Sequence, residues 1–199
     1  MNTSNGRLFS CGGNKQQKVL QTALSLFSQK GFFNTSVHEV VARAGVSVGF
    51  IYHHFKDKQG VARALYDYLL QRMNTLLDEI ELQHNSAQAR CKAVIYMLFE
   101  LTETEPETMS FIIHARHQEF LPQEKPICSA SAFVRMRHFV SEGLQAGELA
   151  PMNSALASAL MYGAAIRLLC LRLDGVLEDH LSYYFEPLWE QVWSQLKAD

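Results

Sequence analysis

Helical periodicity is the feature of this 199-residue sequence that most limits its fold. Apolar residues recur about every 3.6 positions in almost every segment, and no alternating apolar–polar run is long enough for a useful strand. We therefore expect an all-α protein. Asn14 caps the first helix with Gln17 as a capping-box partner, Gly60 weakens the fourth helix, and Pro187 kinks or splits the last one. The expected helices lie at about 15–30, 37–44, 48–54, 57–77, 86–103, 106–120, 129–146, 153–173 and 178–197.

The second and third helices are short and close together. Either Thr35 or Ser36 can cap the second helix, Gly45 allows a sharp exit from it, and Ser47 can cap the third. Two short helices joined by a tight glycine-containing turn form a helix-turn-helix. A long fourth helix follows from Asp57.

Charge is distributed unevenly between the first 58 residues and the rest. The whole chain has a net charge of −2, but residues 1–58 carry +5 and residues 59–199 carry −7. Such an asymmetry indicates that the basic segment meets a polyanion and the remainder does not. The bases of this segment are Arg7, Lys15, Lys18, Lys30, Arg43, Lys56 and Lys58.

Apolar stretches and targeting signals indicate the cellular compartment of a protein. The longest apolar stretches, such as Ala155–Ile166, are interrupted by Ser158 and closed by Arg167, well short of the roughly 18 residues that cross a bilayer. The first 14 residues contain no apolar segment of a secretory signal. We expect a cytoplasmic protein without a membrane span.

Metal and redox motifs are weak in this sequence. The four cysteines are far apart and form no C-x-x-C pair, so buried free thiols are favoured over a redox sensor; they are Cys11, Cys91, Cys128 and Cys170. A group of possible metal ligands lacks the H-E-x-x-H spacing; it comprises His114, His117, Glu119 and His138. We expect no bound metal and no cofactor.

One motif inside the basic segment carries a family resemblance. Residues 35–58 have the sequence TSVHEVVARAGVSVGFIYHHFKDK. Its core, A-G-V-S-x-G-x-[I/L]-Y-x-x-F-x-x-K at Ala44 to Lys58, resembles the DNA-binding domain of the TetR family of transcriptional regulators. The likeness covers about residues 15–65, and the remainder resembles the family only in length and helical layout. It implies a DNA-binding domain over 14–57 and a ligand-binding and dimerisation domain over 58–199. Residues 1–13 are expected to be either a flexible arm that extends the DNA footprint or simply a disordered tail.

The resemblance and the physics of helix ends together give a set of DNA contacts. Helix N-termini suit phosphate, and a glycine lets the recognition helix approach the duplex closely. Apolar side chains can touch a thymine methyl in the major groove. His54 faces either the groove or solvent, and Arg43 and Lys56 either assist electrostatically or are merely solvated. The predicted contacts are Thr35, Ser36, Ser47, Val48, Gly49, Phe50, Tyr52, His53 and the family's phosphate anchor Lys58.

Two further expectations concern the C-terminal part. By resemblance the last two helices pack against their two-fold mates in a homodimer, the alternative being a thick monomer core. The middle helices carry aromatic and polar residues suited to an apolar cavity for a small molecule, with Arg167 as a buried base for an anionic one. The predicted lining is Tyr96, Phe99, Phe111, His114, His117, Phe133, Tyr162 and Arg167.

The sequence therefore predicts a ligand-responsive homodimeric repressor that binds a palindromic DNA operator and is not an enzyme. One alternative is a helical metal-dependent enzyme built on His114 and His117. Another is an architectural DNA-binding protein without a ligand, which predicts no closed cavity in residues 60–175.

Overall fold

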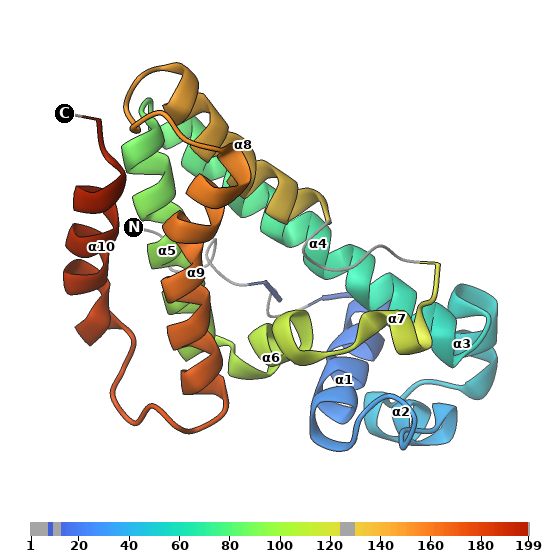
Figure 1. Cartoon of the computed structure of the whole chain (residues 1–199). Coiled ribbons are helices and arrows are strands. Elements are labelled where there is room, and N and C mark those ends of the chain that lie inside the picture. Colours follow the sequence, from blue (N-terminus) through green and yellow to red (C-terminus); the bar gives the residue numbers. More distant parts are fainter. Residues whose placement is uncertain (1–7, 10–12, 124–129, 199) are drawn as a thin grey trace. The chain divides into compact units, whose positions relative to one another are not determined.

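The computed structural model describes residues 8–9, 13–123 and 130–198, which form ten helices and no strand (Figure 1). The all-α expectation is thereby confirmed. The chain divides into two compact units: unit 1 comprises residues 1–73 and 107–127, and unit 2 comprises residues 74–106 and 128–199. These units differ from the predicted domains, whose boundary follows residue 57. The first unit extends to residue 73, within the α4 helix, and also includes residues 107–127. Of the predicted features, Cys11, Cys128, Arg7 and most of the N-terminal arm lie outside the described residues.

Unit 1 is built on three short helices and the first half of a long one. They are α1 (Lys15–Lys30), α2 (Val37–Ala44), α3 (Val48–Phe55) and α4 (Lys58–Gln83). The expected Asn14 capping box begins α1, and Ser36 rather than Thr35 begins α2. α1 packs on α2 and α2 on α3, with Val40, Ile51 and Phe55 turned into the core.

A tight turn joins α3 to α4. Lys56 has a left-handed φ of 71°, and the Asp57 amide donates to the Phe55 carbonyl at 2.9 Å. Asp57 then caps α4 by accepting from the Gly60 amide at 2.7 Å. A Cβ on Gly60 would lie only 1.6 Å from the Phe55 carbonyl oxygen. Gly60 is therefore not simply a weak point, as the sequence suggested, because only glycine fits this close approach.

The helix expected at 106–120 is broken in two, so that prediction was wrong in this detail. α6 (Pro106–His114) ends before Ala115 and Arg116, and the single turn α7 (His117–Phe120) follows. The break lets the His117 ring pack against Tyr66 and Phe111, each at a centroid distance of 5.0 Å. Tertiary packing has overridden two residues that favour helix.

Unit 2 is a helical bundle around α5 (Ala87–Thr104). α5 packs against α8 (Ser131–Gln145), α9 (Ser154–Leu173) and α10 (Ser182–Leu196), as Figure 1 shows. Glu148 closes the N-terminal end of α5, where its carboxylate accepts from the Ala87 and Gln88 amides at 2.9 and 3.0 Å. A negative charge at that end also suits the helix dipole.

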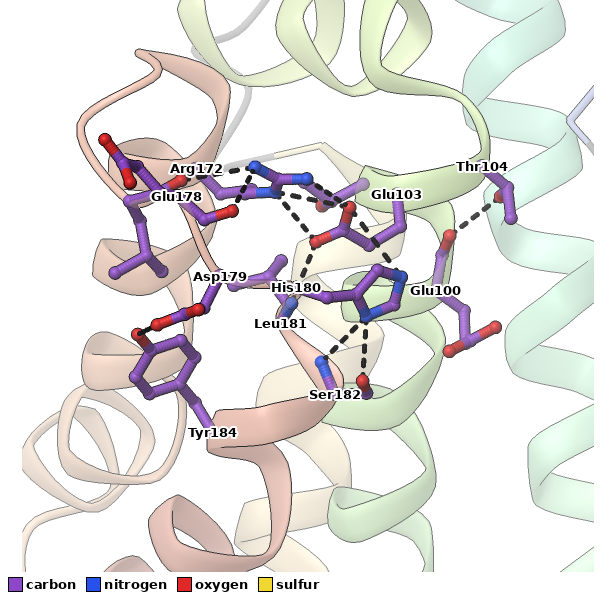
Figure 2. A network of polar contacts seen from close by, with 12 residues as sticks. Glu100, Glu103, Thr104, Arg172, Glu178, Asp179, His180, Leu181, Ser182 and Tyr184 are labelled. Carbon is purple, nitrogen blue, oxygen red and sulfur yellow. Dashed lines mark hydrogen bonds and ion pairs between the residues drawn. The ribbon is translucent and has the colours of Figure 1, made fainter.

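The half-buried carboxylate of Glu103 holds the loop between α9 and α10 onto α5 (Figure 2). Glu103 accepts from Arg172 Nε and Nη2 at 2.9 and 3.0 Å and from the Leu181 amide at 2.8 Å. Burial raises the pKa of Glu103, but these hydrogen bonds outweigh it and leave the pKa below its ordinary value. Since Glu103 holds Leu181, α10 begins at Ser182 and not at 178 as expected.

α10 remains one helix through Pro187, and its apolar side chains are turned inward. Phe185, Trp189 and Val192 are buried. α9 behaves differently: it is long and apolar enough to cross a membrane, with a mean hydropathy of 1.6 and 33% of that window buried. The expectation that no segment reaches that length is corrected here, since Ser154–Leu173 tolerates Arg167 within the run. Because only part of this apolar helix is buried, its remaining face is exposed and can pack against another protein surface.

Candidate nucleic-acid interface

The N-terminal end of α3 is open to a ligand. Ser47 caps it by accepting from the Phe50 amide at 3.1 Å, as predicted from the sequence. Gly49 is exposed, and outside its own helix backbone the nearest described atom to a Cβ built there would be the Ser47 hydroxyl at 3.9 Å. The unpaired amides of a first turn carry a partial positive charge that attracts phosphate.

The N-terminal end of α2 is already occupied by a carboxylate. Glu39 accepts from the Ser36 amide at 2.9 Å and from Lys30 Nζ at 2.6 Å. Hydrogen bonds from Lys30 and Ser36 lower the pKa of Glu39 to about 2. A phosphate at Ser36 must therefore compete with an ionised side chain, whereas α3 presents no such competitor. The sequence pattern S-x-x-E at 36–39 is the signal that foretells this arrangement.

Thr35 supports the motif from inside. Its side chain is only 2% exposed, and its hydroxyl donates to the Gly31 carbonyl at 3.0 Å. The structure thus places this predicted phosphate contact beneath the surface.

The outward face of α3 carries aromatic and imidazole side chains. Tyr52 is 57% exposed, His53 is exposed, and Val48 and Phe50 are half-buried. His54 is exposed but held in place: its ring lies 4.2 Å from that of Phe50, and its Nδ1 is 2.9 Å from Gln16 Nε2 of α1. No pattern in the sequence foretold the part played by Gln16.

Lys58 does not point freely at solvent. Its Nζ donates to the carbonyl oxygens of Phe32 and Thr35, each at 2.9 Å, and lies 4.3 Å from the centroid of the Phe32 ring. Lys58 thereby ties the start of α4 to the turn that leads into α2. Its predicted role as a phosphate anchor stays a prediction, in competition with these contacts.

Other basic residues flank the two short helices. Lys18 Nζ lies 3.8 Å from where a Cβ of Gly45 would be, beside the α2–α3 turn, and Arg43 and Lys56 are exposed. Within the predicted arm, Leu8 and Phe9 are buried, and the Phe9 ring stacks on Tyr68 at 4.8 Å. The arm is therefore anchored at these two positions.

The predicted ligand-lining residues are divided between the two units. In unit 1, Phe111 and His114 line one cavity, and His117 is buried behind it. In unit 2, Phe99 is buried, Phe133 is half-buried and Tyr96 is exposed against Phe185.

Tyr162 and Arg167 of α9 complete the predicted set. Tyr162 is buried and donates to the Met136 carbonyl at 3.2 Å and to Cys91 Sγ at 3.3 Å. Burial raises the pKa of the Cys91 thiol to about 12, which makes it a poor redox sensor. Arg167 is exposed, so the prediction of a buried base was wrong: it lies on the uncovered face of α9.

The predicted histidine cluster is not assembled in the part of the chain that the structure describes. There, no three His, Cys, Asp or Glu side chains come together as metal ligands do. His114 ends α6 and is exposed, His117 is buried in α7, and His138 lies 3.6 Å from Glu142 on α8.

Comparison with known proteins gives the geometry its context. Residues 19–65, which run from α1 into α4, match the family model of bacterial regulatory proteins of the tetR family. Residues 19–65 form a TetR-family domain. Its helix-turn-helix is thus a DNA-binding domain of transcriptional regulators, and TetR-family proteins are regulators and not enzymes.

Curated TetR-family relatives are similar at low identity. The chain is 28% identical over 97 residues to the HTH-type transcriptional regulator BetI of Pectobacterium carotovorum, covering 48% of this chain and 50% of that protein. It therefore spans about half the length of the first relatives it matches. It is 26% identical over 186 residues to BetI of Klebsiella pneumoniae, covering 86% and 91% of the two chains.

Solved TetR-family structures share the fold. A regulator from Marinobacter aquaeolei superposes with a TM-score of 0.74 at 19% identity, covering 93% of this chain and 96% of that one. The regulator FadR of Bacillus subtilis, solved with stearoyl-CoA, also gives 0.74, at 18% identity and with 89% and 97% covered. At these identities the likeness concerns the fold alone.

Proposed function

We propose that this protein is a cytoplasmic homodimeric repressor that binds a palindromic operator and releases it when a small-molecule effector binds. The observation that carries the proposal is the α3 helix. Its first turn is open, its outward face presents Tyr52 and His53, and it stands in a segment with a net charge of +5. A helix of this kind enters the major groove with its N-terminal residues on base edges.

The uncovered face of α9 supports a dimer. Leu156 is 53% exposed and Leu160 is 44% exposed, although both lie on an apolar helix. Small residues stand between and beyond them on the same face: Ala155, Ala159, Gly163 and Ala164 are all exposed. Small side chains allow two helices to approach closely, and a two-fold axis pairs the same face with itself. α10 contributes less than its sequence suggested, because its apolar side chains cover α5 and α9.

Regulation requires two states of the dimer that differ in operator affinity. An effector shifts their equilibrium only by its differential affinity for them. α4 is one continuous helix that begins in the DNA-binding domain and ends in unit 2, so it is the natural lever between effector and DNA.

Selection of bound sequences from a random DNA pool tests this function. We expect a palindromic winner whose half-sites lie about one helical turn apart. His53→Ala should weaken binding to the winner, while His138→Ala, an exposed histidine of α8, serves as the matched control. A folded protein that enriches no sequence would contradict the proposal.

The oligomeric state has its own test. Leu160→Glu should convert the dimer to a monomer in analytical ultracentrifugation, because two carboxylates would meet across the axis. Glu190→Leu, an exposed position of α10, is the control and should leave the dimer intact. A wild-type chain that sediments as a monomer at micromolar concentration would refute the dimer.

A further inference from the structure

A cavity of about 300 Å³ lies within unit 1, beside the DNA-binding helices. It is open on one side and is lined by the end of α1, the turn leading to α2, and the α6–α7 segment. This volume is at the lower end of the range for small-molecule sites. Five of the ten lining residues are phenylalanines: Phe27, Phe32, Phe33, Phe111 and Phe120.

The walls of the cavity are ordered by ring contacts. Phe32 stacks on Phe120 at 4.6 Å with an interplanar angle of 16°, and Phe27 lies 6.4 Å from Phe111. Phe33, by contrast, is 65% exposed, which is unusual for a large apolar side chain. A flat aromatic molecule in the cavity would cover Phe33 and extend the existing stack.

Charge at the rim favours an anionic end on that molecule. Arg116 and Glu119 both line the cavity; the Arg116 side chain is 83% exposed and pairs with Glu119 at 3.1 Å, so an anionic ligand must displace that carboxylate. An exposed ion pair between residues three positions apart contributes little, so a ligand carboxylate can replace Glu119 on the guanidinium in a bidentate contact. A cationic ligand would instead meet the +5 charge of the N-terminal segment and the face of phenylalanine, a weaker cation acceptor than tryptophan.

A buried histidine, His117, packs behind two of the phenylalanines that line the cavity. His117 does not line the cavity, but its ring contacts Phe111 at 5.0 Å and Phe120 at 5.7 Å. Among the residues that the structure describes, its buried Nε2 has no hydrogen-bond partner, which is uncommon in folded proteins. The packing of this aromatic cluster is thus not optimal for the protein alone.

We propose that this cavity binds a small aromatic carboxylate, with its ring among the phenylalanines and its carboxylate on Arg116. The site lies in the same unit as the DNA-binding helices and includes none of the unit 2 residues that the sequence suggested for an effector.

The cavity wall continues directly into the DNA-binding helices. Gly31 and Phe32 line it, the Thr35 hydroxyl is bonded to Gly31, and Lys58 holds the carbonyls of Phe32 and Thr35. A ligand that stacks on Phe32 therefore acts on the turn that leads into α2. That the ligand is the effector rests on the function proposed above, whereas its binding does not.

Calorimetric titration of the DNA-free protein with 2-naphthoate tests the site. We expect one molecule bound per chain. Arg116→Gln should weaken 2-naphthoate about tenfold, the loss of one charge-assisted contact, and leave neutral 2-naphthol unchanged. Ala115→Leu, which fills the cavity, should weaken both compounds, and Arg137→Gln in unit 2 is the matched control.

Circular dichroism melting of each variant shows that the fold is retained. Binding that neither Arg116→Gln nor Ala115→Leu weakens would place the compound elsewhere and overturn the inference. So would a folded wild-type chain that shows no saturable binding. Because this titration contains no DNA, it is independent of operator selection: failure there leaves the cavity intact, and failure here leaves the DNA-binding function intact.

Discussion

Replacing His117 by phenylalanine should stabilise the protein, and more so at acidic pH. The imidazole is only 4% exposed, it contacts Tyr66, Phe111 and Phe120, and no described residue hydrogen-bonds to its Nε2. Burial lowers the pKa of His117 to about 4, from an ordinary value of 6.5. The folded protein therefore keeps this imidazole neutral under conditions where the unfolded chain protonates it.

Linkage gives the sign and size of the pH effect. Between pH 6.5 and pH 4 the unfolded state binds more protons at this residue, so stability falls as the pH falls. At pH 5 the difference amounts to about 2 kcal/mol, at 1.36 kcal/mol for each pH unit below 6.5. At pH 7 the pH term is close to zero, and only the cost of the unsatisfied nitrogen remains, about 1 kcal/mol.

Urea unfolding at pH 7 and pH 5, at one fixed protein concentration, measures these quantities. We expect His117→Phe to be more stable than the wild type by about 1 kcal/mol at pH 7 and about 3 kcal/mol at pH 5. A change in packing alone would alter the free energy of unfolding equally at pH 7 and pH 5. The informative result is therefore a larger difference between variant and wild type at pH 5 than at pH 7. His138→Phe at an exposed position is the control. A gap that is the same at both pH values would refute a neutral buried His117.

Three other substitutions test single contacts. Gly60→Ala should destabilise by about 2–3 kcal/mol in urea unfolding because its Cβ would strike the Phe55 carbonyl, whereas helix propensity alone predicts a gain. Lys58→Met should cost about 1–3 kcal/mol of stability, because its two carbonyl contacts are lost. If Lys58 also anchors a phosphate, the salt-dependence slope of operator binding falls by about one per monomer; an unchanged slope, with Lys197→Met in unit 2 as the control, would contradict that role. Glu103→Gln should lower the free energy of unfolding by about 2–3 kcal/mol at pH 7. The loss should be smaller in acid, because the wild-type carboxylate is itself protonated once the pH falls below its lowered pKa. Equal losses at pH 7 and pH 3 would contradict the ionised contact with Arg172.

Local signals explain which parts of the fold could be predicted from sequence. Capping residues act on their own helix, so the starts at Asn14, Ser36 and Ser47 followed directly from residue type. The break after His114 and the late start of α10 could not be predicted. They depend on the aromatic packing of His117 and on Glu103, 78 positions before Leu181.

The candidate site was likewise predictable from the sequence only in part. The exposed face of α3 followed from helical periodicity and the motif. The contacts that redirect Lys58 to backbone carbonyls and Glu39 to the start of α2 are tertiary or need the folded turn. The placement of Arg167 was missed because an apolar helix looks the same in sequence whether its neighbours belong to the same chain or to a second copy.

Salt titration of the selected operator tests the central claim, that α3 and the basic segment around it bind DNA, most directly. The logarithm of the association constant should fall linearly with the logarithm of salt concentration, by about 0.9 for each phosphate contacted. We predict a steep slope that corresponds to several phosphates per monomer, together with protection of two half-sites one turn apart. A slope near zero, or protection of a single half-site by the dimer, would contradict the proposal.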